Sequence, residues 1–209
     1  MKYKGIIFDL DGVICSTDEY HYRAWKVLAD RLHIPFDRAR NNLLRGVSRM
    51  ESLEIILEKA SHPYTEAEKL AFAEEKNALY RESLKNMSPA DLAEDVKATL
   101  DTLRGQGLRL AIGSSSKNTP FILERIGLSG FFDAVADGNM IMHSKPHPEV
   151  FLKAAAMIGL APAECLVVED AHAGVEAAVS GGFDCAAMGD AKEDPRAKYH
   201  LATFPELLM

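Results

Sequence analysis

The chain has 209 residues, of which 47% are hydrophobic and 26% are charged, as in an ordinary soluble globular protein. Its formal net charge of −7 argues against binding to nucleic acid or to a membrane surface, because both are themselves negatively charged. No stretch approaches the roughly 18 apolar residues of a membrane span, and the apolar run at residues 6–8 is too short for a signal peptide.

The three cysteines, Cys15, Cys165 and Cys185, are odd in number and lack the spacing of metal ligands. Cys165 and Cys185 stand among apolar neighbours and are predicted to be small buried residues. This pattern favours a reduced, cytoplasmic compartment. A monomer is the default expectation for the oligomeric state.

The first predicted elements are short apolar runs that each end in polar residues and a turn. Continuous apolar runs are typical of parallel strands that are buried on both faces of a sheet. Strands that alternate with helices indicate an open parallel sheet with right-handed crossovers. The predicted strands are residues 3–8, 108–112, 134–136, 165–168, 184–188 and about 199–202, and the predicted helices among them are 95–104, 120–126, 148–158 and 174–180, with a short last helix at 205–209.

The interval from about residue 17 to 88 differs, because it contains only amphipathic helical patterns. The predicted helices there are 21–32, 50–60 and 65–85, the last with Leu70, Ala73 and Leu84 on one side. A helical block directly after the first strand predicts a cap over the sheet. We therefore predict an α/β fold with an open Rossmann-like parallel sheet in a core domain (residues 1–16 and 88–209) and an inserted all-helical cap domain (residues 17–87).

The first candidate site is the sequence Asp9-Leu10-Asp11-Gly12, which follows the first predicted strand. A lone Asp-Gly is most often a simple turn. Here, however, two carboxylates two positions apart project to one side of the chain, where one can attack while the other handles a proton. In open α/β sheets, ligands bind at the carboxyl ends of the strands.

Three further groups are predicted at the same sheet edge: Ser114, Lys145 and the pair Glu169-Asp170. Each has an ordinary alternative, as a helix cap, a solvated loop lysine and an acidic helix start. The functional interpretation is that hydroxyls and free backbone N–H groups hold a phosphate, the lysine neutralises charge, and the acids complete a magnesium site.

These four motifs, in this order and with a helical insertion after the first, resemble those of the haloacid dehalogenase-like phosphotransferase superfamily over the whole chain. Further sequences resemble the bacterial β-phosphoglucomutase family, which interconverts β-D-glucose 1-phosphate and glucose 6-phosphate through a bound 1,6-bisphosphate. They are FDLDGVI, Glu19-Tyr20-His21, Arg23-Ala24-Trp25, Gly46-Val47-Ser48-Arg49, Glu51-Ser52-Leu53, Lys76-Asn77, Ser88-Pro89-Ala90-Asp91, Ser116-Lys117-Asn118 and Ser144-Lys145-Pro146.

The resemblance implies a role for each matching position in the core. Asp9 would carry the phosphoryl group, and Asp11 would be the general acid and base for sugar hydroxyls. Magnesium would be bound by Asp9, the backbone carbonyl of Asp11, Glu169 and Asp170. Ser114 and Lys145 would bind the transferring phosphate, and glucose 1,6-bisphosphate would be the activating phosphoryl donor.

The resemblance also implies a second, non-transferring phosphate, which Arg49 of the cap would bind together with Ser116, Lys117 and Asn118 of the core. The remaining residues implied to shape the substrate site are Thr17, His21, Trp25, Gly46, Val47, Ser48, Ser52, Lys76 and Ser115. From spacing alone, His21 and Trp25 share a helix face. Without the resemblance, Arg49 and Lys76 would be taken for surface charges.

Two alternatives to a mutase stay open at this stage. One is a magnesium-dependent sugar-phosphate phosphatase of the same fold, which would not need a second cationic site. The other is a non-catalytic sugar-phosphate sensor, which is disfavoured because every catalytic group is present. In each case the expected partner is a small sugar phosphate.

Overall fold

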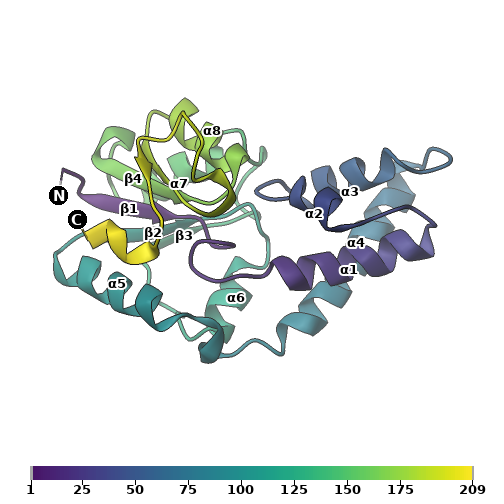
Figure 1. The fold of residues 1–209 in the computed structure, drawn as a ribbon, viewed down its shortest axis with the longest axis horizontal. Coiled ribbons are helices and arrows are strands. Elements are labelled where there is room, and N and C mark those ends of the chain that lie inside the picture. The colour runs from purple at the N-terminus through teal and green to yellow at the C-terminus, as the bar shows by residue number, and fades with distance from the viewer. Residues whose placement is uncertain (1, 209) are drawn as a thin grey trace.

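The computed structural model describes residues 2–208 and contains a six-stranded parallel sheet with the strand order β3-β2-β1-β4-β5-β6 (Figure 1). The predicted α/β fold with an open parallel sheet is therefore confirmed. The strands are β1 (Gly5–Phe8), β2 (Arg109–Gly113), β3 (Ala134–Ala136), β4 (Cys165–Glu169), β5 (Asp184–Ala187) and β6 (Tyr199–His200).

Helices cover both faces of the sheet, which explains why β1 and β4 are apolar and buried along almost their whole length. One face packs against α5 (Glu94–Gly105), α6 (Thr119–Arg125) and the short helix η4 (Phe204–Leu208). The other face packs against α7 (Glu149–Met157) and α8 (His172–Ser180). Alternate residues of β1 serve the two faces, since Ile6 and Phe8 belong to the first cluster and Ile7 to the second.

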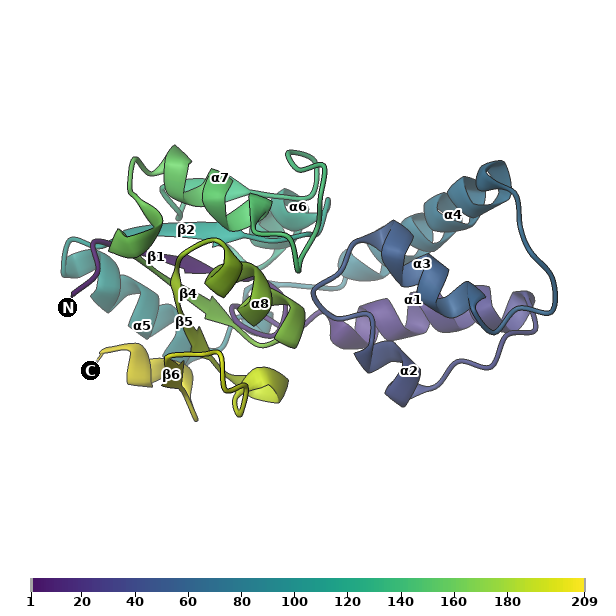
Figure 2. The ribbon, with the colours of Figure 1, turned by 90° about the horizontal axis from the view of Figure 1, so that it is seen from above.

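The predicted helical insertion lies beyond the carboxyl ends of the strands (Figure 2). It consists of α1 (Asp18–Arg31), α2 (Arg38–Asn42), α3 (Arg49–Leu57) and α4 (Glu66–Leu84). These helices have a hydrophobic cluster of their own around Trp25, Leu28 and Leu53. Ala24, Tyr80 and Leu84 belong instead to the cluster on one face of the sheet, so the helices also dock on the core. The domain boundaries at residues 16/17 and 87/88 stay predictions.

Some local expectations were wrong. Helix α2 was not expected, because a five-residue helix is too short to show a helical period; its start is stabilised by Asp37, which accepts a hydrogen bond from Arg40 N. Leu70 was expected on one side of α4 together with Ala73 and Leu84. Those two are buried, whereas Leu70 is 55% exposed and borders the cavity between cap and core. The last helix begins at Phe204, one residue early, and Met209 lies outside the described residues.

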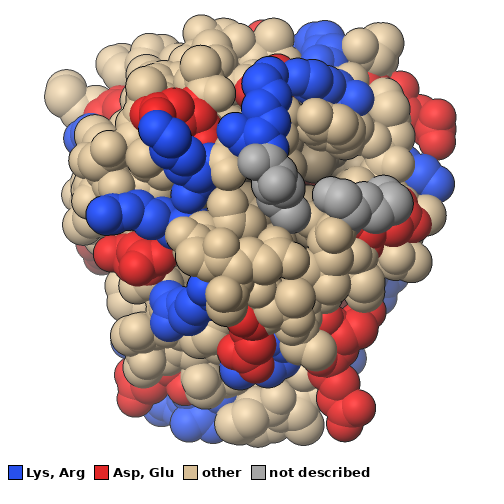
Figure 3. All heavy atoms as spheres, turned by 90° about the vertical axis from the view of Figure 1, so that its left-hand side faces the viewer, with Lys and Arg blue, Asp and Glu red and all other residues tan. Residues whose placement is uncertain are grey.

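The surface opposite the cap, near both chain ends, carries basic side chains interspersed with acidic ones (Figure 3). Several form ion pairs there, such as Lys2 and Lys198 with Asp184. Between residues 2 and 208, no helix is both long and apolar enough to span a bilayer.

Candidate active site

Polar and charged side chains meet where the central strands end. Phe8 lies beside Ile112 in β2 and Val168 in β4, so the residues that follow these strands share one sheet edge. Asp9 follows β1, Ser114 follows β2, and Glu169 ends β4. All three side chains are buried.

Lys145 lies in the loop between β3 and α7, and its side chain is fully buried. Its Nζ donates to Asp9 Oδ1 and, over 2.5 Å, to Glu169 Oε1. Burial by itself lowers the pKa of Lys145, but the charges of Asp9 and Glu169 outweigh it and hold this pKa above its ordinary value. Lys145 is therefore a charged ammonium between two carboxylates.

The same edge has the donor set of a magnesium site. Carboxylate oxygens of Asp9, Glu169 and Asp170 lie within 4.8 Å of one another, and all three residues are buried. Burial, and then the charges of Glu169 and Asp9, raise the pKa of Asp170 to about 9, because one lysine does not neutralise three carboxylates. An all-oxygen, acidic cluster fits Mg²⁺. The prediction for Asp11 concerns its backbone carbonyl and stays a prediction.

Two glycines lie so close to these carboxylates that a side chain at either position would overlap them. Gly12 has a φ of +84°, and a Cβ there would stand 2.0 Å from Asp170 Oδ2. A Cβ on Gly174 would stand 1.9 Å from Glu169 Oε1. Any side chain at either position would displace a carboxylate of the cluster.

The Asp11 carboxylate is turned toward the cap. Thr17, the residue before α1, donates to it twice: from its backbone N to Oδ1 and from its Oγ1 to Oδ2, each over 2.6 Å. Burial raises the pKa of Asp11 to about 6, although the hydrogen bonds from Thr17 act in the opposite direction. A carboxyl with this pKa can both accept and donate a proton near neutral pH.

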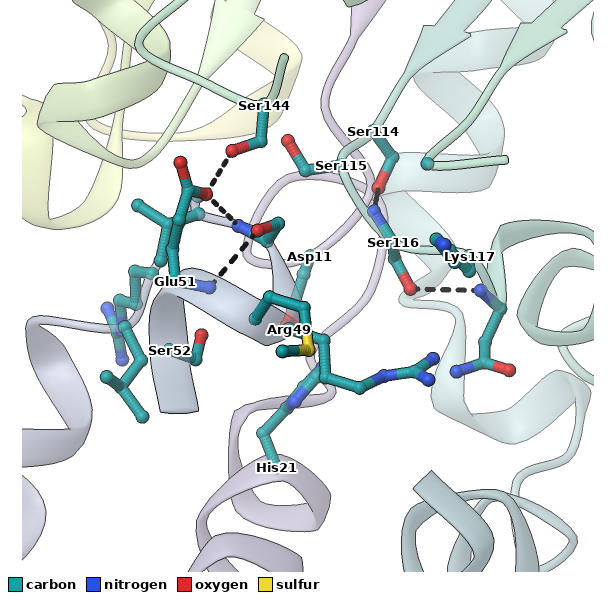
Figure 4. Close-up of a pocket in the computed structure, with 18 of the residues that line it drawn as sticks. Asp11, His21, Arg49, Glu51, Ser52, Ser114, Ser115, Ser116, Lys117 and Ser144 are labelled. Atoms are coloured by element: carbon teal, nitrogen blue, oxygen red, sulfur yellow. Dashed lines mark hydrogen bonds between the residues drawn. The ribbon is translucent and has the colours of Figure 1, made fainter. Parts of the chain in front are cut away.

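The loop after β2 is built from successive serine hydrogen bonds. Ser116 N donates to Ser114 Oγ and Asn118 N donates to Ser116 Oγ, each over 3.2 Å (Figure 4). The side chain of Asn118 is buried, whereas Lys117 is exposed. The Ser115 hydroxyl is buried and has no hydrogen-bond partner among the described residues.

The cap side of the site contains a second buried lysine. Lys76 of α4 is only 2% exposed. Its Nζ lies 2.8 Å from His21 Nδ1 and 4.5 Å from the ring centroids of both Trp25 and Tyr80. Burial, and then the charge of Arg49, lower the pKa of Lys76 well below its ordinary value. No carboxylate among residues 2–208 forms an ion pair with this amine.

Arg49 begins α3, directly after Ser48, whose side chain caps the helix together with Glu51. Its side chain extends toward the part of the site where Ser116 and Lys117 lie (Figure 4). Burial lowers the pKa of Arg49, and within the described chain its guanidinium is not paired with a carboxylate. Arg49 is thus a cation of the cap without a carboxylate partner between residues 2 and 208.

A cavity of about 1060 Å³ separates the two sides. Lys145 and Glu169 do not line it, because they lie behind Asp9. The predicted site residues that do line it are Asp9, Asp11, Thr17, His21, Trp25, Gly46, Val47, Ser48, Arg49, Ser52, Lys76, Ser114, Ser115, Ser116, Lys117, Asn118 and Asp170.

Residues 3–182 match the haloacid dehalogenase-like hydrolase family. The chain belongs to this family. It is 42% identical over 188 residues to β-phosphoglucomutase of Bacillus subtilis, covering 89% of this chain and 83% of that protein. It is 30% identical over 184 residues to a fructose-1-phosphate phosphatase of Escherichia coli, and the match covers 88% of this chain and 95% of that protein.

Among solved structures of this family, the β-phosphoglucomutase of Clostridium difficile superposes with a TM-score of 0.93 at 35% sequence identity, covering 98% of this chain and 93% of that one. The resemblance drawn from the motifs is thereby confirmed. The chain is a phosphotransferase or hydrolase of the haloacid dehalogenase-like family, and relatives of both kinds are similar to it.

Sequence reasoning missed most of the contacts that join cap to core in this family member. Ser144 Oγ donates to Glu51, and Arg45 of the cap forms an ion pair with Asp190 of the core. Tyr80, one turn after Lys76, lines the cavity, and its buried hydroxyl has no hydrogen-bond partner within residues 2–208. Only the spacing of Lys76 and Tyr80 on one helix could have indicated any of these positions.

Proposed function

We propose that the protein is a phosphoglucomutase that interconverts β-D-glucose 1-phosphate and glucose 6-phosphate through a phosphorylated Asp9 and a β-glucose 1,6-bisphosphate intermediate. The observation that carries the proposal is the two-ended cavity. Asp9 lies at one end with Lys145 behind it, and the unpaired cation of Arg49 lies at the cap end. A bisphosphate needs such a second cationic site, whereas a phosphatase does not.

The proposed reaction begins with a phosphorylated Asp9, formed with glucose 1,6-bisphosphate as donor. A sugar hydroxyl attacks the phosphorus, the bond to Asp9 Oδ breaks, and the hydroxyl proton passes to Asp11. The bisphosphate then reorients, and Asp9 takes a phosphoryl group from the other end while Asp11 returns the proton. Each step conserves charge and protons, and most of the rate would come from positioning and electrostatics.

The remaining core residues have supporting roles. Ser114 and Lys145 would bind the transferring phosphoryl group. Magnesium, held by the carboxylates of Asp9, Glu169 and Asp170 with the backbone carbonyl of Asp11, would supply positive charge to that group. Asp11 must leave Thr17 to reach a sugar hydroxyl. Thr17 directly precedes α1, so movement of the cap would free Asp11.

The cap residues would recognise the sugar and its second phosphate. Arg49 with Ser116, Lys117 and Asn118 would bind the distal phosphate, and closure of the cap would exclude water that hydrolyses the aspartyl phosphate. The sugar would contact Thr17, His21, Trp25, Gly46, Val47, Ser48, Ser52, Lys76 and Ser115. We also propose that the enzyme works as a monomer in the cytoplasm, in keeping with its three free, buried cysteines.

A phosphorus NMR time course tests the proposal. Wild-type enzyme is mixed with Mg²⁺, β-glucose 1-phosphate and a catalytic amount of β-glucose 1,6-bisphosphate. We expect glucose 6-phosphate to rise as the substrate falls. Inorganic phosphate that appears at the rate of substrate loss, without glucose 6-phosphate, would contradict the mutase and favour the phosphatase that the Escherichia coli relative represents.

The variant Asp9→Asn is the control for catalysis itself. It removes the nucleophile and should lower turnover by at least about 10³-fold. Wild-type turnover that disappears in this variant excludes the sugar-phosphate sensor, whereas no wild-type turnover on any sugar phosphate would favour it.

A further inference from the structure

Two residues of α4 form hydrogen bonds with the side-chain amide of Asn118, which lies in the core between β2 and α6. Arg81 Nη1 donates to Asn118 Oδ1 over 3.0 Å, and Asn118 Nδ2 donates to Asn77 Oδ1 over 2.9 Å. Asn77 and Arg81 are four positions apart, so they share a helix face. The Arg81 guanidinium also lies 4.7 Å from the ring centroid of Phe121 in α6. Asn118 itself is only 5% exposed.

Arg81 determines the orientation of the two side-chain amides. A guanidinium has five N–H donors and no acceptor, so the amide oxygen of Asn118 must face Arg81. The Asn118 nitrogen then faces Asn77, and the Asn77 oxygen must accept from it. The side-chain nitrogen of Asn77, Nδ2, takes no part in these contacts and has no hydrogen-bond partner among residues 2–208.

Arg81 stands behind the two amides and not in the main cavity. Asn77 and Asn118 line that cavity, whereas Arg81 lines a smaller one of about 590 Å³ on the other side of Asn77. Arg49 borders both cavities. Asn77 borders both cavities as well, and Asn118 is hydrogen-bonded to Asn77, so Arg81 is connected to this part of the main cavity through Asn118.

We propose that Arg81 is a positioning residue that orients the amides of Asn118 and Asn77 so that both present N–H donors to the distal phosphate. A phosphate group only accepts hydrogen bonds at neutral pH, so a flipped amide would point a carbonyl oxygen at it and repel it. Arg81 excludes that flip. The inference rests on the proposed function, because it concerns the second phosphate of the same substrate.

The test compares three variants that separate polarity from packing. Arg81→Lys keeps a donor-only group, Arg81→Gln can donate or accept, and Arg81→Met keeps the aliphatic contact with Phe121 but has no donor. We expect the KM for β-glucose 1-phosphate to rise about tenfold in the Gln and Met variants and less than about threefold in the Lys variant. Hydrolysis of p-nitrophenyl phosphate, which lacks a distal phosphate, should change less than about twofold in all three.

Arg31→Met is the matched control, because Arg31 is also an exposed cap arginine over an aromatic ring, that of Phe72. It should leave both assays unchanged. In an Asn118→Ala background, Arg81→Met should add no further loss, since the two residues act as a unit. Unchanged KM values, equal losses in the Lys and Met variants, or a full additional loss in the Asn118→Ala background would overturn the proposal.

Failure of the proposed function is distinguishable from failure of this inference. If the wild type forms no glucose 6-phosphate, the mutase proposal fails by itself. Arg81 is then tested by calorimetric binding of β-glucose 1,6-bisphosphate to Asp9→Asn protein with and without Arg81→Met. About tenfold weaker binding supports the positioning role, and equal binding overturns it.

Discussion

Two buried lysines stand on opposite sides of the cavity, and their surroundings differ. Lys145 of the core has Asp9 and Glu169 on its ammonium group, and its pKa is held above the ordinary value. Lys76 of the cap has His21 and two aromatic rings around its amine, and burial followed by the charge of Arg49 lowers its pKa. Both side chains are almost completely removed from solvent.

The difference shows what each side of the cavity lacks. The core side has more negative charge than its lysine neutralises, so it is suited to bind a divalent cation. The cation and the lysine together would offset the charge of a phosphoryl group bound there. On the cap side, Lys76 and Arg49 have no carboxylate partner in the described part of the chain, so this side is suited to an anion. A substrate with phosphate at both ends would satisfy the two sides together. Replacement by methionine should therefore lower the free energy of unfolding at Lys145 and raise it at Lys76.

The largest effect is expected for Lys145→Met. Removing one partner of a buried ion pair leaves carboxylates uncompensated, so the free energy of unfolding without Mg²⁺ should fall by about 3–5 kcal/mol. Turnover should fall at least about 10³-fold, because the transferring phosphoryl group loses its neighbouring cation. Urea unfolding, with and without Mg²⁺, measures the first effect, and added Mg²⁺ should recover part of the loss.

Lys153→Met is the matched control for this variant. Lys153 is a half-buried α7 lysine at the surface that pairs with Glu149 over 3.0 Å, and such surface pairs contribute about 0–1 kcal/mol. A Lys145→Met protein as stable as Lys153→Met protein would show that the core cluster does not depend on its lysine.

Arg49→Ala tests the cap side with an intermediate effect. If Arg49 binds the distal phosphate, kcat/KM for β-glucose 1-phosphate should fall about 10²-fold, since a charge-assisted contact is lost. Hydrolysis of a small aryl phosphate, which does not reach the cap, should fall less than about threefold. Arg38→Ala removes an exposed cap arginine that pairs with Glu19 and should change neither. Equal losses in both assays would remove Arg49 from this role.

Much of the fold could be predicted because it depends on local patterns. The apolar runs of β1 and β4 and the lack of strand patterns over residues 17–88 predicted a parallel sheet with a helical insertion. Strand ends then predicted that Asp9, Ser114 and Glu169 would meet, since parallel strands end at one edge. Helix α2 was missed because a single turn and a half has no measurable period.

The side-chain pairs of the site could not be predicted in the same way. Ser144 and Glu51 are 93 residues apart, and Arg81 and Asn118 are 37 apart. Such pairs depend on how the cap docks on the core, and no local signal records it. Lys76 shows the limit most clearly, because its sequence position on an amphipathic helix is that of a surface lysine, whereas the folded chain buries it.

Lys76→Met should have the smallest effect and the opposite sign to Lys145→Met. Replacing a buried amine that has no carboxylate partner by an apolar side chain of similar length should raise the free energy of unfolding by about 1 kcal/mol at pH 7. It should also weaken binding of β-glucose 1-phosphate by about tenfold, because the cap loses a donor for the substrate.

The pH dependence gives this prediction a second measurement. In the folded chain the pKa of Lys76 is lowered by burial and by Arg49, whereas in the unfolded chain it has its ordinary value of 10.5. Between these two pKa values the unfolded chain binds more protons, so the wild type becomes more stable as the pH rises. The stability advantage of Lys76→Met should therefore shrink as the pH approaches 10.5. An exposed lysine variant, Lys59→Met, is the control for the loss of a lysine side chain as such. If Lys76→Met were less stable than wild type at every pH, Lys76 would stabilise the fold of the cap. That result would contradict the inference that the cap side of the cavity is suited to bind an anion.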